Sequence, residues 1–288
     1  MPSRRDFMKQ STLLSAGLMV KPGDFFKNKN PVGVQLYTLR EDIAKNAKGT
    51  IEQVAKLGYK EVETFGYRDG KFFGMSANEF SEFLKSLGLT SPSGHYFGGG
   101  YFLADKWEEK WPSLLADAKG IGQKYVVVPF LEQENRNAES YRKLAGQLNK
   151  AGEMAKASGL QLAYHNHDFE FTDLGGQTGF NILLKETDPK LVQFELDIYW
   201  AVKAGYNPND LFKASPGRYP MWHVKDMDNT DRKYFTEVGN GVINFKNIFA
   251  QSKLSGMKHF FVEQDVCPGP PIESVGKSIT YIRKNLVK

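Results

Sequence analysis

Histidine, aspartate and glutamate recur in this sequence at the ends of short apolar runs. Four successive runs finish in such side chains, which are His165 to Asp168, Glu195 with Asp197, His223 to Asp226, and Glu263 to Asp265. Ionisable groups beside buried segments are costly unless a partner compensates for them. A divalent cation bound by imidazole nitrogen and carboxylate oxygen would be such a partner, so the four clusters together predict a metal site. Any one of these residues alone could instead be a hydrogen-bonded core group or a helix cap.

Eight apolar runs alternate with amphipathic segments along the chain. They cover residues 32–37, 61–65, 89–96, 125–130, 160–165, 192–198, 221–224 and 260–263. Residues 49–57 and 140–158 show helical spacing, and Gly58 and Gly159 after them are typical helix ends. Eight strand–helix units predict an α/β fold, a single (β/α)8 TIM barrel over residues 31–288. The alternative is an open doubly wound sheet, but no Gly-x-Gly-x-x-Gly turn follows the first run, as a dinucleotide-binding sheet would require.

Function in such a barrel sits at the carboxyl ends of the strands. Two residues at these ends, Glu63 and His167, are candidates for proton transfer, and Lys225 is a candidate cation for an oxyanion. The alternatives are a buried ion pair of Lys225 with Glu63 or Asp226, and a supporting hydrogen bond from His167. Aromatic and amide side chains near the strand ends suit a sugar ring and its hydroxyls. The predicted substrate-binding residues are Gln35, Tyr37, His95, Asn166 and Trp200.

Composition excludes several other classes of protein. The chain has 38 basic and 33 acidic residues, a net charge of +5, but residues 1–30 hold six of the basic and only two of the acidic ones. The remaining chain is nearly neutral, which argues against a nucleic-acid partner. The single Cys267 excludes an internal disulfide framework. No apolar run has the 18 or so residues that a membrane span needs, so no stable membrane insertion is expected.

The first 30 residues resemble an export address. Ser3-Arg4-Arg5-Asp6-Phe7-Met8-Lys9 is followed by a short apolar stretch from Leu13 to Val20. This arrangement resembles a bacterial twin-arginine signal, which implies an exported, periplasmic protein. The alternatives are a basic amphipathic helix or a simple tail. We therefore divide the chain into a signal and linker, residues 1–30, and a barrel, residues 31–288.

From residue 32 onward the chain resembles the sugar phosphate isomerase/epimerase superfamily, which has the xylose isomerase-like barrel. The most specific motifs are Val32 to Tyr37, Glu195-Leu196-Asp197, His223-Val224-Lys225-Asp226, Gly239 to Phe245, and Phe261 to Asp265. The resemblance implies one divalent metal, manganese, cobalt or zinc, bound by Asp197, His223 and Glu263. The fifth strand of the family usually supplies a glutamate, and here His165 takes that position as the fourth ligand. A histidine that many epimerases carry three residues after the aspartate is replaced by Trp200.

The resemblance implies an enzyme that acts on a small carbohydrate. Its metal would bind adjacent oxygens, a base would remove the proton beside a carbonyl to give an enediolate, and Glu263 would serve both metal and catalysis. Reprotonation would make the enzyme an isomerase or epimerase. The histidine in the fifth strand favours the inosose dehydratase branch, so a dehydratase or lyase acting on a keto-sugar or 3-keto-glycoside is an alternative. A non-catalytic exported sugar-binding barrel is a further one, and an endonuclease IV-type phosphodiesterase is disfavoured by the nearly neutral barrel.

Overall fold

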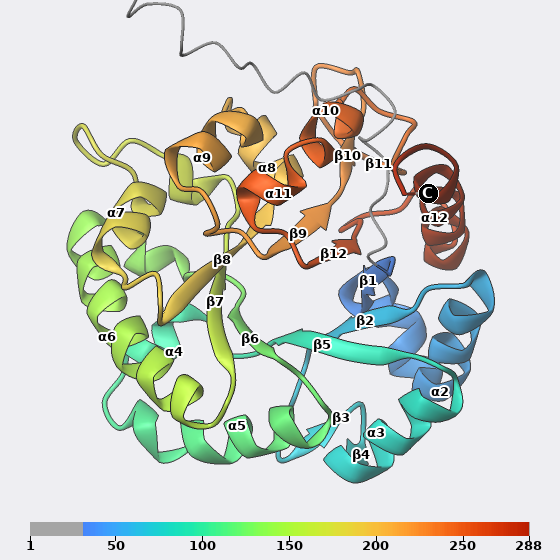
Figure 1. The fold of residues 1–288 in the computed structure, drawn as a ribbon, viewed down its shortest axis with the longest axis horizontal. Coiled ribbons are helices and arrows are strands. Elements are labelled where there is room, and N and C mark those ends of the chain that lie inside the picture. The colour runs from blue at the N-terminus through green and yellow to red at the C-terminus, as the bar shows by residue number, and fades with distance from the viewer. Residues whose placement is uncertain (1–30, 288) are drawn as a thin grey trace, which may run out of the picture.

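A computed structural model describes residues 31–287, and eight parallel strands close into a barrel at its centre (Figure 1). The barrel strands are β1 (Gly33–Gln35), β2 (Glu61–Thr64), β5 (Thr90–His95), β6 (Tyr125–Val128), β7 (Gln161–His165), β8 (Val192–Asp197), β9 (Met221–Val224) and β12 (His259–Val262). Their order around the barrel is β1-β12-β9-β8-β7-β6-β5-β2, so the first strand pairs with the last. The predicted (β/α)8 barrel is confirmed, and each predicted strand overlaps an observed one.

Helices surround the barrel on its outer face (Figure 1). They are α2 (Arg40–Leu57), α3 (Ala77–Ser86), α4 (Gly99–Leu103), α5 (Trp111–Gly120), α6 (Ala138–Ala157), α7 (Gly179–Glu186), α8 (Ile198–Lys203), α9 (Pro208–Ala214), α10 (Phe245–Phe249), α11 (Ser252–Ser255) and α12 (Pro271–Asn285). Short 3-10 turns occur at Leu36–Leu39, Trp107–Glu109, Gln133–Asn135 and Phe169–Phe171. Two hairpins, β3 (Lys71–Phe72) with β4 (Met75–Ser76) and β10 (Asp226–Met227) with β11 (Phe235–Thr236), lie outside the barrel sheet.

Local chemistry explains where these helices begin and end. Asn137 caps α6 by accepting a hydrogen bond from the Ser140 amide, and Gly58 ends α2 in the left-handed conformation at φ 96°. The helix predicted over residues 49–57 is only the second half of α2. The first half buries only Ile43, so it has no apolar periodicity that would reveal it, and Asn46, at φ −155°, interrupts the helical geometry between the halves.

Side chains of four strands, β6, β7, β9 and β12, alternate between two apolar clusters. Residues such as Val126 and Leu162 face the helices, whereas their neighbours Val127 and Ala163 belong to a separate cluster with Met221 and Phe261 inside the barrel. Gly33 stands opposite Phe261, and a Cβ there would lie 2.5 Å from the Phe261 ring. This apolar layer fills the barrel and separates its two polar ends.

The predicted export signal lies outside the described residues. Within residues 31–287, no helix combines the length and apolar character needed to cross a bilayer.

Candidate metal centre

A cavity of about 290 Å³ opens at the carboxyl ends of the barrel strands. This volume is at the lower end of the range of small-molecule pockets, roughly 300–1,000 Å³. Six of the predicted site residues line it, and these are Tyr37, His95, His165, His167, Lys225 and Glu263. Aromatic rings of Phe65, Tyr96 and Phe130 form much of the remaining wall.

Asp197, His223 and Glu263 converge at the floor of this cavity, which Glu263 lines, and each comes from the end of a different strand. One ligand atom of each lies within 4.8 Å of those of the other two, and all three side chains are buried. Nδ1 of His223 is 2.7 Å from Oε2 of Glu263 and 3.9 Å from Oδ2 of Asp197. Two carboxylates and an imidazole are a donor set that suits a divalent cation, so the residues present fit the predicted metal. We call these three residues the upper ligand set.

The fourth predicted ligand, His165, lies at the side of this set. Its Nε2 is 3.6 Å from Oδ2 of Asp197, while its Nδ1 is 3.0 Å from Oε2 of Glu195. The ring therefore lies between the upper ligand set and a carboxylate beneath it.

Lys225 lies against the upper ligand set and is only 1% exposed. Its Nζ is 2.6 Å from Oε2 of Glu263 and 2.9 Å from Oδ2 of both Asp197 and Asp265. Burial opposes the charge on this amine, but these carboxylates raise its pKa well above the usual range. Lys225 is thus in a buried ion pair, as the alternative prediction had it, but not with Glu63 or Asp226, because both of those carboxylates face other partners. Asp226 accepts backbone N–H groups at the loop of Gly239 and Gly241.

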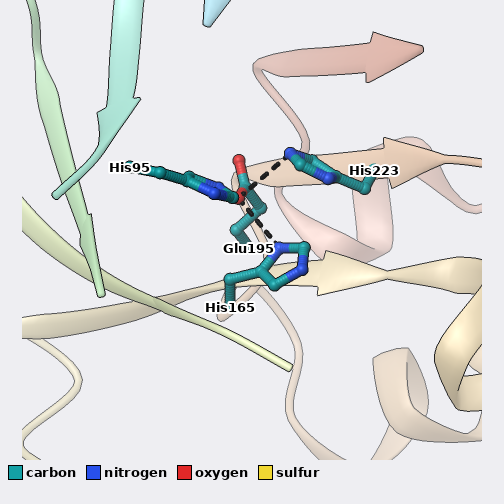
Figure 2. Close-up of side chains that lie close together, drawn as sticks. All are labelled: His95, His165, Glu195 and His223. Atoms are coloured by element: carbon teal, nitrogen blue, oxygen red, sulfur yellow. Dashed lines mark hydrogen bonds and ion pairs between the residues drawn. The ribbon is translucent and has the colours of Figure 1, made fainter. Parts of the chain in front are cut away.

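A second layer lies deeper in the barrel, and we call it the lower layer. Figure 2 shows the rings of His95, His165 and His223 around the carboxylate of Glu195. Oε2 of Glu195 is 2.6 Å from Nε2 of His95 and 3.2 Å from Nε2 of His223. These four side chains also meet the geometric requirement for a metal site.

Glu63 is the other carboxylate of the lower layer, fully buried and not among the residues that line the cavity. Its Oε2 is 2.6 Å from Nε2 of His223 and accepts a hydrogen bond from Nε2 of Gln35 at 2.7 Å. Oγ of Ser93 donates to its Oε1 at 2.5 Å. Gln35 is thus engaged by Glu63 beneath the cavity.

Asn166 and Trp200 are engaged in a similar way by Asp197. The Asn166 side chain exchanges hydrogen bonds with the Asp197 backbone at 3.1 and 3.3 Å. The Trp200 amide donates to Oδ1 of Asp197, which caps α8. Neither residue lines the cavity, so any contact with substrate would need a movement that this structure does not show.

The carboxylates of the two layers outnumber the cations near them. Burial, followed by the charge of Glu195, raises the pKa of Glu63, and burial raises the pKa of Asp197 to about 6. Burial opposes the charge of Glu263, but Lys225 and His223 lower its pKa below the usual range. Burial opposes the charge of His223 as well, but the carboxylates raise its pKa well above its usual range. Protons on His223 and on the carboxylates therefore offset their mutual repulsion in the metal-free protein, and a dication could take the place of those protons.

His167 stands at the edge of the cavity on a rigid support. Its backbone N–H donates to Oε2 of Glu170 at 2.7 Å, and its ring stacks on Phe169 with centroids 5.3 Å apart. Nδ1 of this ring is buried without a hydrogen-bond partner. Burial, together with the nearby Lys225 charge, lowers the pKa of His167 to about 3, so the imidazole is neutral.

Two residues of the centre belong to the predicted strand-end clusters but were assigned no role from the sequence. Glu195 and Asp265 each lie two residues along a strand or its extension from a predicted ligand. Because side chains two residues apart lie on the same face of a strand, this spacing could have indicated that both residues point into the same centre.

Comparison with known proteins places this geometry in context. The sequence pattern of the xylose isomerase-like TIM barrel family matches residues 51–285. The inosose dehydratase of Clostridium botulinum (strain Alaska E43 / Type E3) is 30% identical over 169 residues, 51% of this chain and 55% of that protein. The chain thus matches about half the length of this curated relative.

Solved structures resemble the whole barrel. A sugar phosphate isomerase/epimerase from Parabacteroides distasonis ATCC 8503 is 27% identical with a TM-score of 0.79, covering 90% of this chain and 96% of that one. The IOLI protein, solved with a bound zinc atom, is 16% identical with a TM-score of 0.70, covering 90% of this chain and 99% of that one. The second likeness establishes the fold alone.

Proposed function

The chain belongs to the xylose isomerase-like TIM barrel family of sugar-modifying enzymes, and we propose that it is a divalent-metal-dependent isomerase or epimerase that removes the proton beside a sugar carbonyl. The observation that carries this proposal is the convergence of Asp197, His223 and Glu263 at the floor of a cavity of sugar size. A metal held by these residues and His165 would supply Lewis-acid stabilisation of negative charge on substrate oxygens.

The chain's own residues would handle the proton and the charge. His167 lines the cavity and has an unpartnered Nδ1, so its ring is placed to accept a proton from the carbon beside the carbonyl. Its lowered pKa makes the ring neutral but a weaker base than a free imidazole. Lys225 carries a positive charge at the cavity wall, where it would stabilise an oxyanion. Return of the proton to another carbon gives isomerisation, and its return to the opposite face gives epimerisation.

The cavity favours an unphosphorylated sugar. Among the described residues that line it, Lys225 is the only lysine or arginine, and three carboxylates already surround its ammonium. A phosphate group would meet the negative charge of Glu263 and Asp265 without a free cation to bind it. The proposed substrate is therefore a free or glycosidic sugar.

A dehydratase or lyase is the second candidate, and a specific similarity favours it. The relative with 30% identity over about half its length is named as an inosose dehydratase. Dehydration of a keto-sugar begins with the same proton abstraction and then expels a group from the next carbon. His167 and Lys225 would have the same roles in that first step.

Incubation with a panel of free sugars, keto-sugars and 3-keto-glycosides in deuterated water tests both candidates. Solvent deuterium in a recovered or rearranged sugar supports the isomerase or epimerase, whereas release of water or an aglycone supports the lyase. The His167→Ala variant should lose the exchange, and the matched His259→Ala variant, altered at the other end of the barrel, should retain it. Binding without any exchange across the panel would contradict both and favour a sugar-binding barrel.

We also propose that residues 1–30 direct export to the periplasm, on the basis of the Arg4-Arg5 pair and the apolar stretch after it. A fusion of this segment to a reporter should be exported in bacteria with a twin-arginine pathway. Replacing both arginines by lysine should retain the reporter inside, and unchanged export would contradict the proposal.

A further inference from the structure

We infer that Glu63 and Glu195 are positioning residues that fix opposite tautomers of His223 and His165, so that each ring presents its unprotonated nitrogen to the metal. The inference rests on the proposed metal function of the upper ligand set. It assigns Glu63 and Glu195 the task of orienting ligands, with no contact to substrate, since neither lines the cavity.

His223 is held between carboxylates on both sides of its ring. Nε2 points down to Oε2 of Glu63 at 2.6 Å, and Nδ1 points up to Oε2 of Glu263 at 2.7 Å. A neutral imidazole has one N–H and one lone pair. A metal on the upper ligand set needs the lone pair on Nδ1, so the proton must be on Nε2, where Glu63 accepts it.

His165 shows the same arrangement with its two nitrogens exchanged. Nδ1 points to Oε2 of Glu195 at 3.0 Å, and Nε2 faces Oδ2 of Asp197 at 3.6 Å. The ring therefore donates from Nδ1 to Glu195 and keeps its lone pair on Nε2. Since one carboxylate lies beneath each ring, the two ligands are bound through different nitrogens.

Neighbouring donors hold these carboxylates in place. Gln35 and Ser93 donate to Glu63, and His95 lies with Nε2 at 2.6 Å from Glu195. The residues in each contact are far apart in the sequence, and all five side chains are buried or nearly so. Such a network restricts each imidazole to one orientation before metal arrives, which lowers the cost of binding.

The lower layer could in principle bind a second metal, since His95, His165, Glu195 and His223 lie close together. The upper ligand set is the better metal site because its carboxylate Glu263 lines the cavity, whereas Glu195 does not. The shortest contacts, 2.6 and 3.0 Å from Glu195 to His95 and His165, have the length of charge-assisted N–H···O bonds. The 2.7 Å contact of His223 with Glu263 in the upper ligand set has a similar length, so distances alone do not separate the two layers. A second metal is therefore an outcome that the experiment must detect.

The first measurement needs only the wild-type barrel with histidine labelled with ¹⁵N and loaded with zinc. A two-bond ¹H–¹⁵N correlation spectrum identifies which ring nitrogen carries the proton in each of the five histidines. We expect one equivalent of zinc, with the proton on Nε2 of His223 and on Nδ1 of His165. The opposite tautomer in either ring, or a second equivalent of zinc bound at His95, would overturn the inference.

The second measurement uses Glu63→Gln and Glu195→Gln, which keep the size of each side chain and remove its charge. Each should weaken zinc binding about 10–100-fold in competition with a chromophoric chelator, because the ligand ring loses its ionised acceptor. In the spectrum, Glu195→Gln should alter the His165 proton and Glu63→Gln the His223 proton.

Glu61→Gln is the matched control. Glu61 is on β2 like Glu63, but it pairs with His259, outside the centre. It should leave the zinc affinity and the ring signals of His165 and His223 unchanged, and alter only the signals of His259. Unaltered affinity in both lower-layer variants would overturn the inference, and the wild-type spectrum decides the matter if a variant fails to fold. No zinc uptake by the wild type would overturn the proposed function as well, whereas one equivalent with the wrong tautomers would overturn this inference alone.

Discussion

The two ends of the barrel each contain a glutamate of β2 paired with a histidine. Glu61 at the amino end lies 2.9 and 3.0 Å from Nδ1 of His259, and Glu63 at the carboxyl end lies 2.6 Å from Nε2 of His223. The glutamates are two residues apart on one strand and face the same interior. Within residues 31–287, Glu61 is the only carboxylate within 4.0 Å of His259, whereas four carboxylates lie within that distance of His223.

The difference shows that residue type alone does not mark the functional end. At the amino end one carboxylate pairs with one imidazole, and each is the hydrogen-bond partner of the other. At the carboxyl end four carboxylates surround one imidazole, and protons or a bound cation must offset their mutual repulsion. A surplus of buried like charge distinguishes a binding centre from a structural ion pair.

His223→Ala should produce the largest contrast between the two ends. Loss of an upper ligand should reduce zinc or manganese content from about one equivalent to a small fraction, because the remaining ligands no longer enclose the ion. His259→Ala should retain full metal content, as measured by elemental analysis after loading and desalting. Equal metal loss in both variants would contradict the distinction between the ends.

Lys225→Met should reveal the charge imbalance as a loss of stability. Removing the buried ammonium leaves three carboxylates without their cation, so the free energy of unfolding of the metal-free protein should fall by about 3–5 kcal/mol. Added metal should stabilise this variant more than the wild type, since the dication replaces the lost charge.

The control for this variant is Lys277→Met. Lys277 also pairs with a glutamate, Glu237, but its side chain is 60% exposed. Denaturant unfolding should show a change of less than about 1 kcal/mol. A similarly small change in Lys225→Met would mean that the centre has no excess of negative charge.

The pH dependence of stability should be reduced by Glu170→Gln. Burial raises the pKa of Glu170 to about 7, so the folded protein holds this proton more tightly than the unfolded chain does. Its contribution is full below pH 4.5 or so and is lost as the pH rises through about 7, which costs about 3 kcal/mol. Unfolding of the metal-free wild type and variant at pH 5 and pH 8 measures this, and an unchanged difference between the two pH values would count against a buried, neutral Glu170.

Gly33→Ala should have the smallest effect of the four, by disturbing the apolar layer between the two ends. The new Cβ would lie 2.5 Å from Phe261, and such overpacking costs about 1–3 kcal/mol. Gly146→Ala is the control with the opposite sign, because Gly146 lies inside α6 with nothing within 4 Å of an added Cβ. Helix propensity should make that variant about 0.5–1 kcal/mol more stable, as denaturant unfolding would show.

The barrel strands could be predicted because both of their faces are buried. Strands such as Tyr125–Val128 and Met221–Val224 lie between helices and the barrel interior, so they read as continuous apolar runs. The hairpin of Lys71–Phe72 with Met75–Ser76 was not predicted, because two-residue strands leave no periodic pattern.

The upper ligands were predicted by position, but their partners were not. His95 on β5 meets Glu195 on β8, and Glu63 on β2 meets His223 on β9. In each case two other strands lie between them in the sheet, so the contacts cross the barrel interior. No spacing along the chain encodes such a contact.

The sequence by itself determined the number of strand–helix units and the group of polar residues at their carboxyl ends. The alternation of strand and helix segments and the length of the apolar runs are local properties, so one sequence is enough to recognise them. Only the tertiary structure decided that Glu63 and Glu195 lie beneath the imidazoles and that Lys225 lies among Asp197, Glu263 and Asp265. The physical reason is closure of the barrel, which brings side chains of non-adjacent strands within hydrogen-bonding distance and thereby sets the charge balance of the centre.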